Sequence, residues 1–301
     1  MVHDARVLVT GASGFLGRHI VCYFTGIGID VIAGVRRPDA SEVPAVRLDL
    51  ADVASIESAI AATRVTHIIN CAAYGVEQSL QNYSDAFSVN VKGCFDLMKA
   101  AARAGASRFV QVGSCSEYAN SDRPIPETAP PQPQNLYAVC KAVASTMVLD
   151  LGPALGLDVV VVRPFSMWGP GEHAYRLFPQ ILAACRARRP LALTTCEIIR
   201  DYSFVADTAA WIGRVALSAD VAPGTIINIG SGKAVLLREF ALSVAAYLGG
   251  VSLLEFGARP ERPNEPRSWI ADVTRLEHLI GPLRHTRFED GLEQMLKSSV
   301  V

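Results

Sequence analysis

The sequence predicts an α/β fold, a Rossmann-type doubly wound parallel sheet followed by a smaller C-terminal region. Short β-branched runs alternate with helical patterns through the first half of the chain, and these runs are apolar throughout. A glycine-rich turn follows the first run directly. Continuous apolar strands separated by helices are typical of a parallel sheet buried on both faces, and right-handed crossovers place helices on each face.

Six runs are expected to form the strands of the first half. "FLGRHIVCYFTGIG" (15–28) has a helical pattern after the first run, and helical segments precede the fourth and fifth. Their length and β-branched content favour strands over short buried helices. The expected strands are 6–10, 30–35, 45–50, 65–73, 107–114 and 157–164.

The chain after Pro164 departs from this rhythm. A Gly/Pro loop and a helix (165–182) are followed by a strand and helix (200–217), one more strand (225–232), and a proline-rich tail with short helices. We therefore expect a nucleotide-binding domain at 1–164 with a returning segment at about 202–230, and a smaller region at 165–301. The proline-rich stretch 121–135 is either a surface connector or a wall of the substrate site.

Composition excludes several classes of function. Half of the 301 residues are apolar and the net charge is -1, which argues against a nucleic-acid partner. No run of about eighteen uncharged apolar residues exists, so no membrane span is expected. No signal peptide is visible, and the seven cysteines form no CxxC pair, which predicts reduced thiols and a cytoplasmic protein. The six histidines lack metal-ligand spacing, so no metal is expected.

The turn "VTGASGFLG" (9–17) is a candidate phosphate-binding loop. Gly11, Gly14 and Gly17 follow a strand and open a helix, where missing side chains let backbone N–H groups approach a pyrophosphate. The spacing is GxxGxxG instead of GxGxxG, but the strand before and the helix after support the same role. The predicted cofactor-binding loop also includes Ser13, Phe15 and Leu16.

The end of the second strand predicts which cofactor binds. NAD-preferring sites usually carry an acidic residue about twenty residues after the loop, where it holds the ribose hydroxyls. Here that place is taken by Val35, followed by Arg36 and Arg37. Because guanidinium groups bind a 2′-phosphate with charge-assisted hydrogen bonds, the sequence favours NADP(H) over NAD(H).

Six motifs together carry a resemblance to a known family. "TGASGFLG", "NCAA", "NVKG", "GSCSEYA", "YAVCK" and "RPFSMWGPG" occur in the order of the extended short-chain dehydrogenase/reductase family. The chain most resembles the NAD(P)-dependent epimerase/dehydratase/reductase group that acts on nucleotide sugars. The resemblance implies a Rossmann domain, a smaller C-terminal substrate domain, a nucleotide-diphosphate sugar as substrate, and a homodimer formed by helices around 83–104 and 136–153.

The resemblance also implies roles for individual residues. Asp49 and Leu50 match adenine contacts, and Ser114, Tyr137 and Lys141 match the catalytic Ser/Thr and the YxxxK pair. Further implied cofactor contacts are Cys71, Ala72, Ala73, Asn90, Tyr137, Lys141, Pro164 and Ser166. The candidate substrate contacts are Tyr74, Ser114, Ser116, Ser166, Arg176, Arg200 and Arg267. Ser166 departs from the family, which often has Asn there.

The YxxxK spacing supports acid–base chemistry. Tyr137 and Lys141 are expected on one face of a helix, one turn apart. An ammonium near a phenol favours the ionised form, so Lys141 is expected to lower the pKa of Tyr137. Tyr137 would then exchange a proton with a carbonyl or hydroxyl oxygen while Ser114 donates a hydrogen bond to the same oxygen.

The residues after Ser114 discriminate among the reactions that the resemblance implies. In the family's 4,6-dehydratases an Asp-Glu pair follows the catalytic Thr, where this chain has Cys115 and Ser116. In the epimerase-reductases of fucose-type sugars, a cysteine occupies the position of Ser116. Because successive side chains of an extended segment point to opposite faces, we expect Cys115 to pack in the interior. Glu117 is expected to be a surface or structural carboxylate, with the contribution of a proton as the alternative.

The predicted function is NADPH-dependent reduction of the 4-keto group of a nucleotide-linked 4-keto-6-deoxyhexose, giving a nucleotide deoxysugar. The alternatives are an NAD(P)-dependent nucleotide-sugar epimerase, a non-catalytic dinucleotide-sensing regulator, and a reductase of a small non-nucleotide ketone or aldehyde. Four arginines bear on the last alternative, since convergence in a cleft would suit a diphosphate. They are Arg176, Arg200, Arg262 and Arg267.

Overall fold

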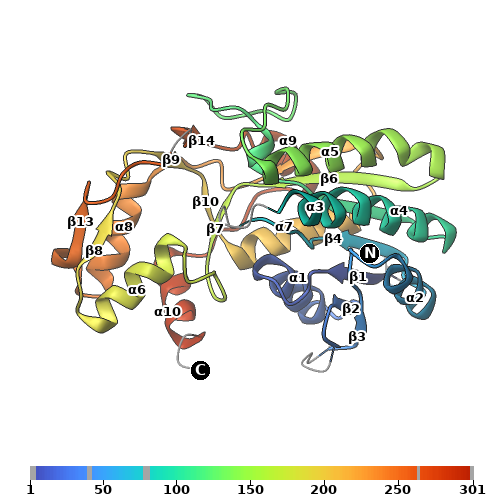
Figure 1. Cartoon of the computed structure of the whole chain (residues 1–301), viewed down its shortest axis with the longest axis horizontal. Helices are drawn as coiled ribbons and strands as arrows, with labels where there is room; N and C mark the ends of the chain where they lie inside the picture. The colour runs from blue at the N-terminus through green and yellow to red at the C-terminus, as the bar shows by residue number, and fades with distance from the viewer. Residues whose placement is uncertain (1–4, 39–42, 77–81, 263–264, 299–301) are drawn as a thin grey trace.

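A seven-stranded, fully parallel sheet forms the centre of the computed structural model, which describes residues 5–38, 43–76, 82–262 and 265–298 (Figure 1). The strand order is β11-β6-β5-β4-β1-β2-β3. The strands are β1 (Arg6–Thr10), β2 (Asp30–Val35), β3 (Ala45–Arg47), β4 (His67–Asn70), β5 (Arg108–Val112), β6 (Asp158–Pro164) and β11 (Thr225–Ile229). The predicted doubly wound sheet is confirmed, and each of its first six strands lies within the predicted run.

The direction of strand order changes next to β1. β1 pairs with β2 on one side and with β4 on the other, so the chain winds outward in both directions from this strand. In open parallel sheets the crevice for a ligand lies at the carboxyl ends of the strands at such a point. The glycine-rich turn that follows Thr10 therefore lies where a dinucleotide would bind.

Helices cover both faces of the sheet. Along β1, Val7 and Val9 pack toward α1 (Phe15–Gly26), α7 (Val205–Leu217) and α9 (Thr274–Ile280). Leu8, between them, packs toward α2 (Val53–Thr63), α4 (Gly93–Arg103) and α5 (Leu136–Leu151). Successive side chains of a strand point to opposite faces, which is why continuous apolar runs fit this double-sided burial.

The first of the two helices expected for a dimer is interrupted. It comprises α3 (Tyr83–Phe87), a π-helical turn η2 (Ser88–Lys92) and α4. Gly93 follows the π turn, and a Cβ at this position would lie 2.3 Å from the backbone oxygen of Leu50. The glycine of "NVKG" therefore allows the helix to approach the segment after β3.

The elements after Pro164 add small sheets and helices beside the main sheet. They include β7 (Ser166–Trp168) paired with β10 (Tyr202–Phe204), β9 (Ile199–Arg200) between β12 (Val235–Leu236) and β14 (Ser268–Trp269), and β8 (Leu191–Leu193) paired with β13 (Leu254–Phe256). Their helices are α6 (Leu177–Ala187), α8 (Leu237–Tyr247) and α10 (Phe288–Ser298), which lie to one side of the sheet in Figure 1.

An aromatic core holds these outer helices together. Trp168 stacks on Phe178 of α6 with ring centroids 5.5 Å apart, and it also contacts Phe204 and Phe240. Meanwhile α7 and β11 return to the main sheet. The boundary at residue 164 stays a prediction, and Pro263 and Asn264 of the proline-rich tail lie outside the described residues.

Candidate active site

The glycine-rich turn is shaped to receive an anion. Gly11 has a φ of +63°, and a Cβ on it would lie 2.7 Å from the Cα of Ala72. A Cβ on Gly17 would lie 2.2 Å from the backbone oxygen of Gly11. Helix α1 then begins without a side-chain cap on its first amides. Uncapped amides at a helix N-terminus bind phosphate groups, so the geometry fits a dinucleotide pyrophosphate.

The predicted loop residues Ser13, Phe15 and Leu16 belong to this turn and the start of α1. Arg18 braces the turn, since its Nη2 donates to the Ser13 carbonyl at 2.8 Å and its Nε to the Gly14 carbonyl at 3.2 Å. Ser13 is exposed and Leu16 is buried. The side chain of Leu16 therefore anchors the turn, while the backbone around Ser13 faces outward.

The end of β2 presents two free cations. Val35 is buried, whereas Arg36 and Arg37 are exposed. Neither arginine makes a hydrogen bond or ion pair with any other residue that the structure describes. Nearby, Leu50 is buried and Asp49 accepts a 3.0 Å hydrogen bond from the Ala51 amide. The carboxylate of Asp49 thus shapes its own turn, and the guanidinium groups remain available.

A row of buried polar side chains crosses the carboxyl ends of three strands. Thr10, Asn70 and Gln111 occupy adjacent positions on β1, β4 and β5 and are each at most 1 % exposed. The Thr10 hydroxyl donates to Asn70 at 2.7 Å, and the Asn70 amide donates to Gln111 at 2.8 Å. The Thr10 oxygen also accepts from the Ala72 amide at 3.1 Å. This row fixes the segment after β4.

The segment Cys71–Tyr74 is closed by Asn90. The Asn90 side chain accepts from the Tyr74 amide at 2.8 Å and donates to the Tyr74 carbonyl at 2.9 Å. Asn90 is buried, Cys71, Ala72 and Tyr74 are partly exposed, and Ala73 is exposed. The asparagine of "NVKG" is therefore a backbone clamp for the predicted cofactor-contact segment.

Sequence reasoning missed Thr10, Asn70 and Gln111 as part of the site. The available signal was three hydrogen-bonding side chains near the ends of otherwise apolar runs. Their alignment in one row depends on strand register, which the runs alone do not specify. The row leads to Lys141, because Gln111 donates to the Val112 carbonyl at 3.2 Å, and this carbonyl also accepts from the lysine.

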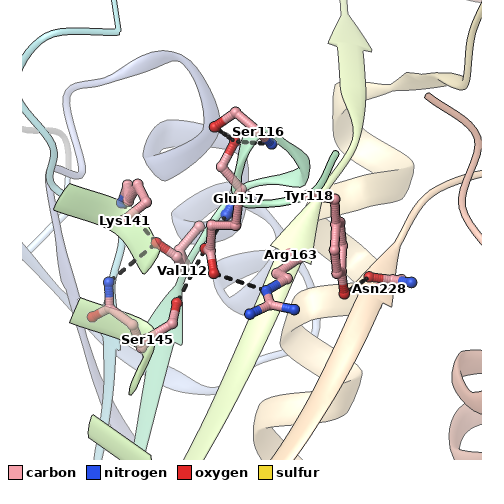
Figure 2. A network of polar contacts seen from close by, with 10 residues as sticks. Val112, Ser116, Glu117, Tyr118, Lys141, Ser145, Arg163 and Asn228 are labelled. Atoms are coloured by element: carbon pink, nitrogen blue, oxygen red, sulfur yellow. Dashed lines mark hydrogen bonds and ion pairs between the residues drawn. The ribbon is translucent and has the colours of Figure 1, made fainter. Parts of the chain in front are cut away.

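Tyr137 and Lys141 lie on α5, one turn apart, as predicted. Asn135 caps the helix by accepting from the Ala138 amide at 2.9 Å, which sets the position of Tyr137 in the first turn. The Lys141 Nζ lies 5.8 Å from the centre of the Tyr137 ring. It donates to the Val112 carbonyl at 2.7 Å (Figure 2). The lysine is buried, and burial lowers its pKa.

The predicted lowering of the Tyr137 pKa by Lys141 is wrong in this structure. Burial raises the pKa of Tyr137, and the neighbouring Cys115, Glu117 and Cys71 add to this rise, which the Ser114 hydroxyl opposes only in part. The lysine ammonium donates to a backbone carbonyl instead of to the phenol oxygen. The phenol is consequently protonated at neutral pH.

Ser114 precedes a short 3-10 turn, η3 (Cys115–Glu117), which follows β5. The Ser114 Oγ accepts from the Ser116 amide at 3.1 Å and from the Ser116 hydroxyl at 2.8 Å. Both serines are partly exposed. Ser116 therefore contacts Ser114 directly, and the hydroxyl of Ser114 lies near enough to Tyr137 to lower the pKa of its phenol.

The two other residues of this turn are buried. Cys115 packs against Tyr118, Ile125 and Phe165, and burial raises the pKa of its thiol to about 12. The predicted packing role of Cys115 is confirmed. Glu117 is 0 % exposed and pairs with Arg163 at 2.8 Å, so the structural role expected for it is confirmed and the surface role is wrong.

The proline-rich stretch 121–135 contacts the turn. The Gln132 amide donates to the Glu117 carbonyl at 2.7 Å, and Ile125 exchanges backbone hydrogen bonds with Ile270 and Asp272. The stretch therefore connects the candidate catalytic turn to the segment after β14. These contacts favour a wall of the site over a free surface connector.

Two of the four arginines of the C-terminal half, Arg176 and Arg200, lie near the candidate catalytic turn. Arg176 and Arg200 both lower the pKa values of the Cys115 thiol and the Tyr202 phenol, which places the two guanidinium groups in one neighbourhood. Arg200 is buried and lies 2.5 Å from a Glu265 oxygen. Arg262 and Arg267 are exposed.

The predicted residues after β6 lie beside the same neighbourhood. Pro164 ends β6, and Ser166 opens β7 paired with Tyr202 of β10. Arg176 directly precedes α6, and its Nε lies 3.7 Å from the carboxylate of Glu172. The structure therefore gathers Ser166, Arg176 and Arg200 near Cys115, whereas the side chain of Arg267 is exposed.

Two further properties concern the described residues as a whole. No set of three or more His, Cys, Asp and Glu side chains in the described part of the chain is arranged to hold a metal ion. None of the helices within residues 5–38, 43–76, 82–262 and 265–298 is long and apolar enough to cross a membrane.

Comparison with known proteins agrees with this geometry. The family model of the NAD dependent epimerase/dehydratase family matches residues 7–230. A UDP-glucose 4-epimerase of Azospirillum brasilense is 29% identical, covering 94% of this chain and 89% of its own length. A GDP-6-deoxy-D-mannose reductase of Pseudomonas aeruginosa is 27% identical over 78% of this chain and 77% of its own. The crystal structure of a Thermus thermophilus UDP-glucose 4-epimerase in complex with NAD has a TM-score of 0.86 at 25% identity, covering 97% of this chain and 98% of that one.

Proposed function

The chain belongs to the NAD-dependent epimerase/dehydratase family, and from this premise we propose that it reduces the 4-keto group of a nucleotide-linked 4-keto-6-deoxyhexose with NADPH. The observation that carries the proposal is the turn after β5. It brings a Ser114 hydroxyl to Tyr137 and offers no free carboxylate, since Glu117 is buried in an ion pair. This arrangement suits protonation of a carbonyl oxygen during hydride transfer.

The protonation state of Tyr137 fits a proton donor. A phenol whose pKa is at or above its ordinary value of about 10 carries its proton at neutral pH, so Tyr137 can donate it to the oxygen of a carbonyl being reduced. Ser114 donates a hydrogen bond to the same oxygen and stabilises the charge that develops there. One N–H of the Lys141 ammonium donates to the Val112 carbonyl, which leaves two N–H donors for the ribose of a cofactor. NADPH, when bound, supplies the hydride to the carbonyl carbon.

The choice of NADPH rests on the end of β2. Arg36 and Arg37 are exposed and are not engaged by other described residues, so both can turn toward a 2′-phosphate. Val35 occupies the position where an acid would hold the ribose of NAD. The Thermus relative is described with NAD bound. The cofactor is therefore a property to be tested on this chain.

Dehydration fits the site poorly. The dehydratases of the family carry an Asp-Glu pair after the catalytic Thr, whereas Cys115 here is buried with a neutral thiol and Ser116 is bonded to Ser114. Elimination of water requires an additional acid and base that neither of these residues supplies. A regulator without turnover also fits poorly, since Ser114, Tyr137 and Lys141 are assembled together.

Epimerisation of a nucleotide sugar is the second candidate. The similarity to UDP-glucose 4-epimerases over nearly the whole chain favours it. A 4-epimerase keeps its cofactor bound and regenerates it, usually NAD, whereas Arg36 and Arg37 at the end of β2 favour NADPH consumed as a reductant. We therefore rank the reductase first.

We also propose that the chain forms a homodimer and that its C-terminal elements bind the nucleotide diphosphate. Tyr83 and Phe87 of α3 are 70% and 57% exposed, and Val139 and Val143 of α5 are 44% and 42% exposed. Helices α3 and α5 pack together, so these side chains form one apolar surface suited to a second copy of the chain. The elements after Pro164 that lie outside the main sheet, with Arg176 and Arg200, would bind the nucleotide diphosphate.

The decisive experiment offers the protein NADPH or NADH with UDP-, dTDP- and GDP-linked 4-ketosugars. We expect loss of reduced-nicotinamide absorbance and a 4-hydroxy product with NADPH. Tyr137→Phe should lower kcat on the order of 10²- to 10⁴-fold while leaving cofactor affinity unchanged. The exposed Tyr247→Phe serves as the matched control. Isomerised sugar without net NADPH oxidation would replace the reductase by the epimerase.

A further inference from the structure

A fully buried ion pair lies directly behind the candidate catalytic serine. The Glu117 carboxylate accepts three hydrogen bonds, from the Arg163 Nε at 2.8 Å, the Ser145 hydroxyl at 3.1 Å and the Ser114 amide at 2.9 Å. Figure 2 shows Glu117 between Ser145 and Arg163. Glu117 and Arg163 are 0 % and 2 % exposed. The two charges join a turn after β5 to the end of β6.

The surrounding backbone is built to admit this carboxylate. A Cβ on Gly113 would lie 2.3 Å from the Glu117 Oε1, so a side chain at this position would displace the carboxylate. The backbone N–H of Gln132 donates a 2.7 Å hydrogen bond to the backbone carbonyl of Glu117. Glu117 is thus fixed at both its backbone and its side chain.

Stability alone is a weak reason for such a pair. Removing two charges from water is costly, and a pair of apolar side chains of similar size is often as stable or more so. What the pair does hold is Ser114. Its amide is bound by Glu117, while its hydroxyl oxygen accepts from both the amide and the hydroxyl of Ser116.

These contacts determine what the Ser114 hydroxyl can do. A serine oxygen has two acceptor positions and one proton. Both acceptor positions are used by Ser116, so only the proton remains, and Ser114 can act only as a donor toward Tyr137 or a substrate oxygen. A donor whose oxygen already accepts hydrogen bonds is also strengthened by them.

We propose that Glu117 is a positioning residue: through the Ser114 amide it holds the turn in which the Ser114 hydroxyl is a dedicated hydrogen-bond donor to the reacting oxygen. This inference deepens the proposed function and rests on it. Glu117 does not touch the substrate and exchanges no proton. Its effect on turnover passes through Ser114.

A double-mutant cycle tests this dependence. Glu117→Gln places an amide N–H₂ against the Arg163 Nε–H and loosens the turn, and we expect kcat to fall on the order of 10- to 100-fold with cofactor affinity unchanged. In a Ser114→Ala background the same change should cost no further activity, because the group being positioned is gone. Losses that multiply would overturn the proposal.

A matched control separates positioning from general loosening. Tyr118→Phe removes the 2.9 Å hydrogen bond from the Tyr118 hydroxyl to Asn228 in the same buried network, yet leaves the Glu117 contacts to Ser114 intact. We expect lower stability with kcat within about twofold of wild type. An equal loss of kcat in both variants would mean that the network acts only by stabilising the fold.

Two further measurements keep the test decisive. If Glu117→Gln does not fold, the apolar pair Glu117→Leu with Arg163→Met should restore stability without restoring kcat. Exchange of the Ser114 amide hydrogen, followed by NMR, should accelerate in the Glu117 variants and stay unchanged in Tyr118→Phe. Unchanged exchange in the Glu117 variants would refute the positioning. Accelerated exchange in a protein that turns over no nucleotide sugar would refute the proposed function alone.

Discussion

The carboxyl of Glu172 makes stability depend on pH in a way that can be measured without knowing the substrate. Glu172 lies on the loop after β7, its side chain is 4% exposed, and its Oε2 has no hydrogen-bond partner among the described residues. Arg176 is the nearest cation, at 3.7 Å. Burial outweighs this cation and a backbone hydrogen bond, and it raises the pKa from 4.5 to about 7.

The direction of the effect follows from proton binding. Between about pH 4.5 and 7 the folded chain holds a proton on Glu172 that the unfolded chain has lost, so the free energy of unfolding falls as pH rises. A difference of 2.5 pKa units corresponds to about 3 kcal/mol, of which roughly 2 kcal/mol is lost between pH 5 and 7. The stabilising contribution is fully present below pH 4.5 and absent above the folded-state pKa.

Glu172→Gln isolates this contribution because the amide mimics the protonated acid at every pH. We expect urea unfolding to give nearly equal stabilities for the two proteins at pH 5, and a variant more stable by about 2 kcal/mol at pH 7.5. Glu57→Gln, at an exposed position, should change stability by less than about 0.5 kcal/mol at both pH values. A constant difference between Glu172→Gln and wild type across this range would refute the reasoning.

Three other predictions follow from the site and the surface. In steady-state assays Ser114→Ala should lower kcat on the order of 10²-fold, whereas Cys115→Ala should keep kcat within about threefold of wild type. The reverse order would indicate that the Cys115 thiol, and not the Ser114 hydroxyl, takes part in the reaction. Arg36→Ala should weaken NADPH binding about tenfold and leave NADH binding unchanged, as titration of each cofactor would show. Val35→Asp combined with Arg36→Ala should shift the cofactor preference toward NADH, and an unchanged preference would mean that Arg36 does not bind the 2′-phosphate. Phe87→Glu should convert a dimer to a monomer in sedimentation, with the exposed Val251→Glu as control, and a dimer that persists would exclude the α3–α5 surface.

Local patterns are sufficient to predict the sheet and the tight glycine-rich turn after its first strand. Residues 6–10 and 30–35 form β1 and β2 as expected because continuous apolar runs have few other ways to be buried on both faces. The sequence places glycines at 11 and 17, where a tight turn between strand and helix is expected. The structure gives the physical reason, since a Cβ at either position would clash with backbone. Both features are properties of short segments.

Features that join distant segments could not be predicted. Glu117 and Arg163 are 46 residues apart, and the sequence alone left Glu117 between a surface and a structural role. The Tyr137 pKa was misjudged for the same reason: the YxxxK spacing reveals the neighbouring lysine, but burial and the Val112 carbonyl come from other elements. Ion pairing and pKa shifts depend on strand register and burial, and neither can be predicted from a single segment of sequence.

The contacts of Tyr118 argue that the returning segment at about 202–230 is needed to complete the region formed by residues 1–164. Its hydroxyl donates to Asn228 on β11, and the Asn228 side chain in turn donates to the Ile125 carbonyl at 2.7 Å. The backbone N–H of Asn228 donates to Glu127 at 3.0 Å, so the returning strand bonds both to Tyr118 and to the proline-rich stretch. A fragment that ends at residue 164 would lack Asn228 and would leave these buried polar groups unpaired. The buried polar groups of residues 1–164 therefore depend on a strand supplied by the returning segment.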